Sequence, residues 1–124
     1  MKKIFLIMLV CFSIIFTANA DEGRTCRVYN SKYTATISHG STMVSGDSPY
    51  VSIVVESPEE ALGYGNTVTV WVNALDRSSG CIEETIEVVI LVKGGQTKGS
   101  RSASFKKLEK GKYYNVSIDR ASCD

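Results

Sequence analysis

The feature that most constrains the fold is an alternation of apolar and polar residues with a period of two. It recurs along most of the chain after residue 20, for example at Val51, Ile53 and Val55, and β-branched and aromatic residues dominate its apolar positions. Successive side chains of an extended strand point to opposite faces, so the alternation predicts strands with one buried face. The stretches that show it lie around 26–29, 33–38, 51–55, 68–74, 86–92, 103–105 and 114–118.

Turn-forming segments separate these stretches, at 45–49, at 76–80 and at Gly94-Gly95. Ser57 and Pro58, followed by two acidic residues, predict a single helical turn over 57–62 with Ser57 as its N-cap. The segment 93–101, rich in glycine and basic residues, is interpreted as a solvated hairpin loop. About seven short strands joined by turns predict an all-β, antiparallel β-sandwich that forms a single domain over 21–124.

The first 20 residues have the pattern of a cleaved secretory signal peptide. Lys2 and Lys3 precede an apolar run over 4–16, which is too short to span a membrane, and the run is followed by the small-x-small triplet 18–20. We therefore expect Asp21 to be the new N-terminus. A lipoprotein signal centred on Cys11 is a poor fit, because Val10 stands where a small residue is required. The predicted location is outside the cytoplasm, either periplasmic or secreted.

The charge balance and the cysteine count follow from this interpretation. The whole chain has 14 Lys+Arg and 13 Asp+Glu, a balance that points neither to nucleic acid nor to an anionic membrane as a partner of the mature form. Cys26, Cys81 and Cys123 remain after cleavage, and an oxidising compartment favours at least one disulfide among them. The odd count leaves one thiol free or available to another chain.

One local pattern extends from Leu108 through Gly111 and Tyr114 to alternating apolar residues that end at Ile118. It resembles the corner before strand F in fibronectin type III and related immunoglobulin-like domains. The resemblance implies an immunoglobulin-like arrangement of the sandwich, with Leu108, Gly111 and Tyr114 as a structural corner. In that family the tyrosine hydroxyl bonds to the backbone of the corner, a role that Tyr114 is expected to fill.

The same resemblance bears on the disulfides. It implies that the first strand starts at the end of the sandwich where the last strand finishes, which brings Cys26 near Cys123 and makes their pairing the favoured one. Cys81 is then left free or as an alternative partner. The pairings Cys81–Cys123 and Cys26–Cys81 stay open at this point.

Little in the chain points to catalysis. The single histidine, His39, has no evident partner for acid–base work, and no residue near Cys81 in sequence is placed to activate it as a nucleophile. The acidic pairs at 59–60 and 83–84 are more typical of solvated strand ends than of a glycosidase site. No spacing of cysteine, histidine and acidic residues suggests a metal site, and no cofactor motif is present. We expect a protein that is not an enzyme, although a small hydrolase is kept as a remote alternative.

A binding surface is predicted on the side of the sheet that faces away from the core. If the stretches around 68–74, 86–92 and 114–118 share a sheet, four apolar side chains gather on its outer face. Exposed apolar clusters with aromatic anchors often mark binding sites; the alternative is that another segment covers this face. The proposed cluster comprises Trp71, Val89, Leu91 and Tyr113.

Together these features predict an exported binding or structural module that recognises a protein or a glycan. The surface would be the outer patch or the loops around Gly46 and Gly95. An alternative is a periplasmic inhibitor or immunity-type protein that neutralises an enzyme through a loop. The identity of the ligand and the oligomeric state are not specified by the sequence.

Overall fold

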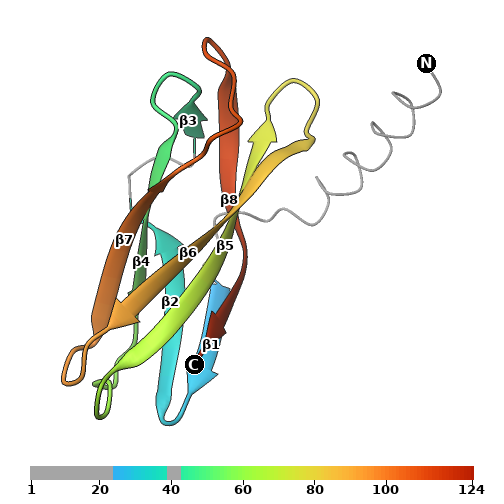
Figure 1. The fold of residues 1–124 in the computed structure, drawn as a ribbon. Coiled ribbons are helices and arrows are strands. Elements are labelled where there is room, and N and C mark those ends of the chain that lie inside the picture. Colours follow the sequence, from blue (N-terminus) through green and yellow to red (C-terminus); the bar gives the residue numbers. More distant parts are fainter. Residues whose placement is uncertain (1–23, 39–42) are drawn as a thin grey trace.

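The computed structural model describes residues 24–38 and 43–124, and these residues contain eight strands and no helix. The strands form two four-stranded antiparallel sheets that pack face to face (Figure 1), with the orders β1-β2-β4-β7 and β3-β8-β5-β6. None of the described residues belongs to a helix long and apolar enough to cross a membrane. The strands span Arg24–Val28 (β1), Ser31–Ile37 (β2), Met43–Ser45 (β3), Tyr50–Glu56 (β4), Asn66–Asp76 (β5), Ile82–Val92 (β6), Lys98–Ser104 (β7) and Tyr113–Cys123 (β8).

The alternation seen in the sequence places the core. Inward-facing residues of both sheets bury their side chains against one another, while their neighbours along each strand face out. The predicted all-β sandwich is thus confirmed. The largest completely buried side chains are Tyr33, Tyr114, Ile53, Ile90, Val51, Val55, Val68, Val70, Val72, Val88, Val92 and Val116.

Two differences from the predicted strands have a tertiary origin. β3 is an additional strand of three residues, which is too short to show a period and is held by pairing with the start of β8. β7 begins at Lys98, inside the segment interpreted as a loop, because its backbone pairs with β4 from Lys98 to Ser104. The serine-rich sequence of β7 gave no apolar signal over 98–102.

One side of the sandwich is closed by the disulfide between Cys26 of β1 and Cys123 of β8, whose Cα atoms lie 5.6 Å apart. The favoured pairing is therefore confirmed. Next to it, the Nε–H of Arg24 donates to the carbonyl oxygens of Ile118 and Asp119 at 3.3 Å each. Cys81 is not a free thiol either, since no free cysteine occurs among the described residues. The prediction that one thiol is free, or available to another chain, concerns the chain after cleavage of the signal peptide and stays a prediction.

The opposite side is closed where β6 and β7 meet. The guanidinium of Arg101 on β7 donates to the carbonyl oxygen of Val89 on β6 at 2.9 Å. The carboxylate of Glu84 on β6 accepts the backbone N–H groups of Lys106 and Lys107 at 2.6–2.9 Å. Side chains thus occupy backbone groups at two edges that a foreign strand could otherwise pair with.

The corner before β8 has the geometry that the sequence predicted. The backbone N–H of Glu109 donates to the hydroxyl oxygen of Tyr114 at 3.0 Å, across five residues. Gly111 has a φ of 81°, and Leu108 packs partly buried against the core. The structural role of Leu108, Gly111 and Tyr114 is confirmed, while the family resemblance that suggested it stays an expectation.

The helical turn predicted over 57–62 is wrong. The Ser57 hydroxyl does accept the N–H of Glu59, at 3.2 Å, as an N-cap would. No helix follows, because the backbone groups of this segment bond to another loop: the N–H of Ser57 donates to Thr97 O, and that of Ala61 to Gln96 O, at 2.8 Å each. Tertiary hydrogen bonds have replaced the local ones.

Candidate functional site

The premise of the predicted patch, that the three strands share a sheet, is correct: β8, β5 and β6 are neighbours in one sheet. Trp71, however, is half-buried beneath Arg120, whose guanidinium carbon lies 4.1 Å from the centre of the indole ring. A bulge in β8 opposite Trp71 and Val72 shifts this strand by one residue and turns Arg120 to the outer face. A cation therefore covers part of the ring that was expected to be presented for binding.

The patch also does not form one cluster. Val89 lies opposite Thr69 of β5, whereas Tyr114, the neighbour of Tyr113, lies opposite Asp76. At about 3.3 Å per residue these positions are on the order of 20 Å apart along the sheet. The prediction that Tyr113 joins Trp71, Val89 and Leu91 is therefore wrong, because alternation specifies a face of a strand but not the register between strands.

Tyr113 borders a cavity of about 400 Å³ with Asp76, Arg77, Ser78 and Lys112. The carboxylate of Asp76 accepts the hydroxyl and the backbone N–H of Ser78 at 2.8 Å each. The hydroxyl contact is the largest cause that lowers the pKa of Asp76, and Lys112 at 3.8 Å adds to it. A hydrogen bond to Glu109, at 3.2 Å, raises the pKa of Lys112. These charged groups are satisfied by one another, which is typical of a structural turn.

The Gly46 loop lies at this same end of the sandwich. Gly46 is buried, and its N–H donates to the carbonyl oxygen of Lys112 at 2.9 Å. A side-chain Cβ at Gly46 would lie 1.7 Å from the carbonyl oxygen of Glu109, so the two loops are packed backbone to backbone. The loops around Gly46 and Gly95 are thus at opposite ends of the molecule (Figure 1) and cannot form one site.

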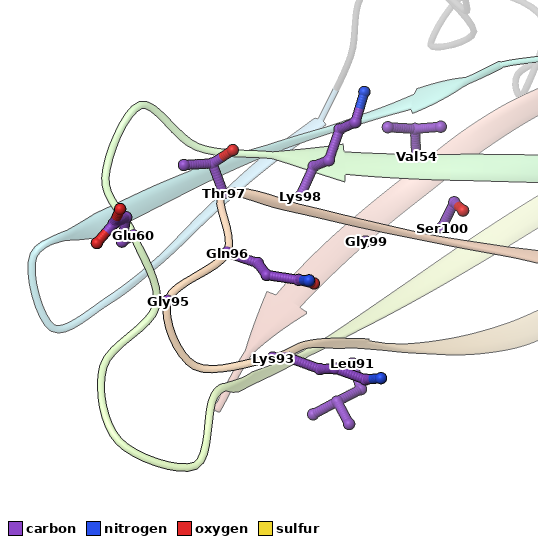
Figure 2. Close-up of a pocket in the computed structure, with 10 residues that line it drawn as sticks. All are labelled: Val54, Glu60, Leu91, Lys93, Gly95, Gln96, Thr97, Lys98, Gly99 and Ser100. Carbon is purple, nitrogen blue, oxygen red and sulfur yellow. The ribbon is translucent and has the colours of Figure 1, made fainter.

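A larger hollow than the one beside Tyr113 lies at the other end, next to Gly95. It is an open groove of about 790 Å³ between the outer surface of β4 and β7 and the end of β6 (Figure 2). Figure 2 shows the Gln96 side chain extending into the space between the Lys98 and Lys93 segments. Leu91, from the predicted patch, stands at the margin. The lining residues are Val54, Glu60, Leu91, Lys93, Gly95, Gln96, Thr97, Lys98, Gly99 and Ser100.

Two loops, 57–65 and 93–97, form one hydrogen-bonded unit beside this groove, which we call the double loop. Ala61 bonds in both directions: its N–H donates to Gln96 O and its carbonyl accepts the N–H of Gly95, at 2.8 Å each. Within each loop, a further bond of 3.0 Å runs from Gly65 N to Leu62 O and from Gln96 N to Lys93 O. Such a network holds the loop backbone in place before any ligand arrives.

Two glycines let the loops approach this closely. A Cβ on Gly94 would lie 2.0 Å from the carbonyl oxygen of Gly63, and one on Gly65 would lie 2.3 Å from that of Val92. Gly65 also has a φ of 101°, a conformation that side-chain-bearing residues rarely adopt. The shape of the double loop therefore depends on the absence of side chains at these positions.

Three large side chains project into solvent from this end of the molecule. Leu62 and Tyr64 belong to the double loop; Leu62 is 60% exposed, and Tyr64 is completely exposed between Gly63 and Gly65. Tyr29, 77% exposed, lies at the tip of the hairpin between β1 and β2. Figures 1 and 2 both place this hairpin beside the double loop. We call this region, with the groove, the loop end.

Tyr29 occupies an unfavourable conformation. Its φ is 52°, and it is the one non-glycine residue with a positive φ in the described part of the chain. It stands first in the two-residue turn that joins Val28 to Ser31, a position where glycine is the usual choice. The left-handed conformation costs about 1–2 kcal/mol for a residue with a side chain. An exposed ring recovers little of this cost through burial, so the tyrosine points to a role other than stability.

Sequence reasoning missed Tyr29, Leu62 and Tyr64. Tyr29 was assigned to the alternating stretch 26–29, but it lies in the turn after β1, and Leu62 and Tyr64 also lie in turns. In a turn, neither the strand nor the helix periodicity predicts which side chains are buried. A signal was present in the apolar residues interleaved with glycine over 61–65 and in the tyrosine before Asn30 at a turn between two strands. Large apolar side chains in tight turns have little core to reach, which makes their exposure the expected result.

The described residues show no arrangement for metal chemistry, since they contain no group of three or more histidine, cysteine or acidic side chains that could hold an ion. His39 lies outside these residues. The groove presents one carboxylate, at Glu60, together with an amide, hydroxyls and ammonium groups. These groups can form hydrogen bonds and ion pairs with a ligand.

Comparisons with known proteins place the chain in no family. No family model matches it, and no curated protein matches it. A solved structure of the Avr2 effector protein from the fungal plant pathogen Fusarium oxysporum matches with a TM-score of 0.35 and 12% sequence identity. That match covers 71% of this chain and 63% of the effector chain, and similarity at this level is too low to indicate a shared fold.

Proposed function

We propose that this protein is an exported, non-enzymatic binding module that recognises a protein or a glycan through the loop end. Export is supported by the signal-peptide pattern of the first 20 residues and by the Cys26–Cys123 disulfide, which is typical of oxidising compartments. The mature chain is proposed to act in the periplasm or outside the cell, without a cofactor.

The observation that carries the proposal is the pairing of a groove with a rigid double loop. Association costs the entropy of ordering the interface, and a surface that is already ordered loses less of it. The reciprocal hydrogen bonds of Ala61 and the close packing at Gly94 provide that order. Gln96, Thr97 and Ser100 offer polar groups that could orient a ligand, while Leu91 and Val54 offer apolar contact.

The test uses a groove variant and a matched control. In Gln96→Ala/Lys98→Ala, two exposed side chains that line the groove are removed. In Lys107→Ala/Lys110→Ala, two exposed side chains are removed at the opposite end. All three proteins are screened against an oligosaccharide array and against proteins of the compartment to which the chain is exported. Each detected interaction is then measured by calorimetry with the purified component.

We expect the groove variant to bind at least about 10-fold more weakly than the wild type, and the control to bind equally well. Thermal unfolding of all three should coincide within a few degrees, because exposed substitutions of this kind change stability little. A groove variant that binds as tightly as the wild type would remove the groove from the binding site, and a control that loses binding would move the site away from the loop end and overturn the proposal.

A further inference from the structure

We infer that the loop end recognises a protein, and that Tyr64 is its anchor, entering a concave apolar pocket of the partner with Tyr29 as a second contact. The inference rests on the proposed function and specifies the ligand class and the residues that bind it. Neither tyrosine lines the groove, so this surface is distinct from the one tested above.

The first step is the shape of the site. Tyr64 is completely exposed, which means that no neighbouring side chain stands beside its ring. A small-molecule ligand is usually held in a concave site that surrounds most of its surface. A protruding ring cannot surround a ligand, but it can be surrounded by one. The complementary shape is a pocket, which a folded partner protein can supply.

The second step is rigidity. Tyr64 lies between two glycines of positive φ, at 58° and 101°, and a flexible tip would be the first expectation for such a sequence. Here the N–H of Gly65 is bonded to Leu62 O, and Gly63 packs against Gly94. The ring is therefore displayed from a defined backbone. Tyrosine adds a large contact area for the loss of only two side-chain torsions, which is why it dominates loop-based protein recognition.

The third step is the second tyrosine. Tyr29 keeps a strained backbone and an exposed ring, and its hairpin lies beside the double loop in both figures. Leu62 adds an apolar side chain on the same loop as Tyr64. Two exposed tyrosines on neighbouring tips match the composition of protein hot spots, where a few aromatic residues dominate the affinity, and Leu62 adds apolar contact area.

The charges around the tips indicate how the complex is stabilised. Glu59 and Glu60 of the double loop balance Lys93 and Lys98 at the groove, so the double loop and the groove produce no strong field of one sign. Binding through neutral tips should then depend mainly on apolar contact. We expect the affinity to change by less than about 3-fold between low and physiological salt, unlike that of a charge-steered complex.

The experiment introduces a photo-crosslinking residue into the full chain, expressed in its native host. The variants Tyr64→p-benzoylphenylalanine and Tyr113→p-benzoylphenylalanine are compared; Tyr113 is 55% exposed and lies at the opposite end. The crosslinked protein is identified by mass spectrometry and purified, and its affinity for the wild type and for single variants is measured by calorimetry.

We expect one protein to be crosslinked from position 64 and not from position 113. Tyr64→Ala should bind the purified partner at least about 30-fold more weakly, Tyr29→Ala about 10-fold more weakly and Tyr113→Ala equally well. The alanine variants of the two tyrosines should melt no lower than the wild type, and Tyr29→Gly should melt higher, which separates a binding role from a structural one.

Three results would overturn the inference. Equal crosslinking from both positions would show unspecific contact. A purified partner that binds Tyr64→Ala as tightly as the wild type, but loses affinity for the groove variant, would leave the proposed function standing without this anchor. An oligosaccharide that binds through Tyr64 in place of any protein would show that the ligand class is wrong. If neither the groove nor the tyrosine variants affect any interaction, the proposed function itself fails.

Discussion

The disulfide between β1 and β8 permits a quantitative prediction about stability. Cys26 and Cys123 are separated by 97 residues, so the bridge closes almost the whole domain into one loop. In the double variant Cys26→Ser/Cys123→Ser this loop is opened, and every other side chain is kept. The perturbation acts mainly on the unfolded chain, which regains the conformations that the bridge had excluded.

The magnitude follows from the loop length. In the chain-entropy relation, a loop of this length removes about 16 cal/mol/K from the unfolded ensemble, which is about 4.7 kcal/mol at 25 °C. Typical domains are stable by only about 5–15 kcal/mol. The double variant should therefore lose between about a third and nearly all of the wild-type stability, and its melting temperature should fall by roughly 20 °C or more.

The assay is urea unfolding followed by fluorescence, because the chain has a single tryptophan and Trp71 lies half-buried in the central strand β5 beneath Arg120. The control is Ser122→Ala, an exposed substitution next to the bridge that should change the free energy of unfolding by less than about 0.5 kcal/mol. Cys81 is kept in all proteins so that the difference reports only the bridge.

A loss of less than about 1.5 kcal/mol in the double variant would refute the reasoning. It would mean that the unfolded chain already holds its ends together, or that native contacts of β1 do not depend on the bridge. A loss near the predicted value would support the loop-closure argument if the free energy of unfolding keeps the same slope against urea concentration. An altered slope would instead indicate a change in the surface exposed on unfolding.

Three further predictions concern individual residues. Gly94→Ala forces a Cβ against a backbone oxygen, and it should lower the free energy of unfolding by about 1–3 kcal/mol and weaken binding at the loop end. Gly95→Ala has open space around the new Cβ but a φ of 84°, and it should lower the free energy of unfolding by only about 1 kcal/mol, as measured by thermal unfolding. Tyr114→Phe leaves the N–H of Glu109 without its acceptor and should lower the free energy of unfolding by about 1–2 kcal/mol in urea, and an unchanged value would remove the corner from the account of stability. Asp76→Asn should reduce the loss of stability at acid pH. The pKa of Asp76 is lowered in the folded protein, mainly by its hydrogen bond to the Ser78 hydroxyl. The contribution of Asp76 to the free energy of unfolding is therefore complete above the ordinary pKa of 3.8 and is lost as the pH falls through the lower pKa of the folded state. A wild type and an Asp76→Asn variant with parallel curves below pH 4 would contradict that assignment.

Much of the fold could be predicted because alternation is a local property. Val51, Ile53 and Val55 face the core for the reason that the sequence suggested, and the corner at Tyr114 needs only five residues to form its hydrogen bond. Ser57 shows the limit of local reasoning: its side chain caps the next turn as predicted, yet its backbone bonds to Thr97 and no helix forms.

The candidate site was predicted less well, because it depends on which segments become neighbours. The loop around Gly95 was among the surfaces considered, and Leu91 was rightly placed on an outer face, but the Trp71 patch was not realised. A bulge in β8 brought Arg120 over the ring, and the register separated Tyr113 from the rest. Neither event leaves a trace in the period of the sequence.

The sequence by itself determined most of the strands and their buried faces, which follow from side-chain alternation, and the corner at Tyr114, whose hydrogen bond joins residues only five positions apart. The tertiary structure alone decided the register of the sheets, the loop-to-loop hydrogen bonds of Ala61 and the exposure of Tyr64. These depend on residues far apart in the chain, whose relative positions are settled only when the two sheets pack and the loops at each end meet.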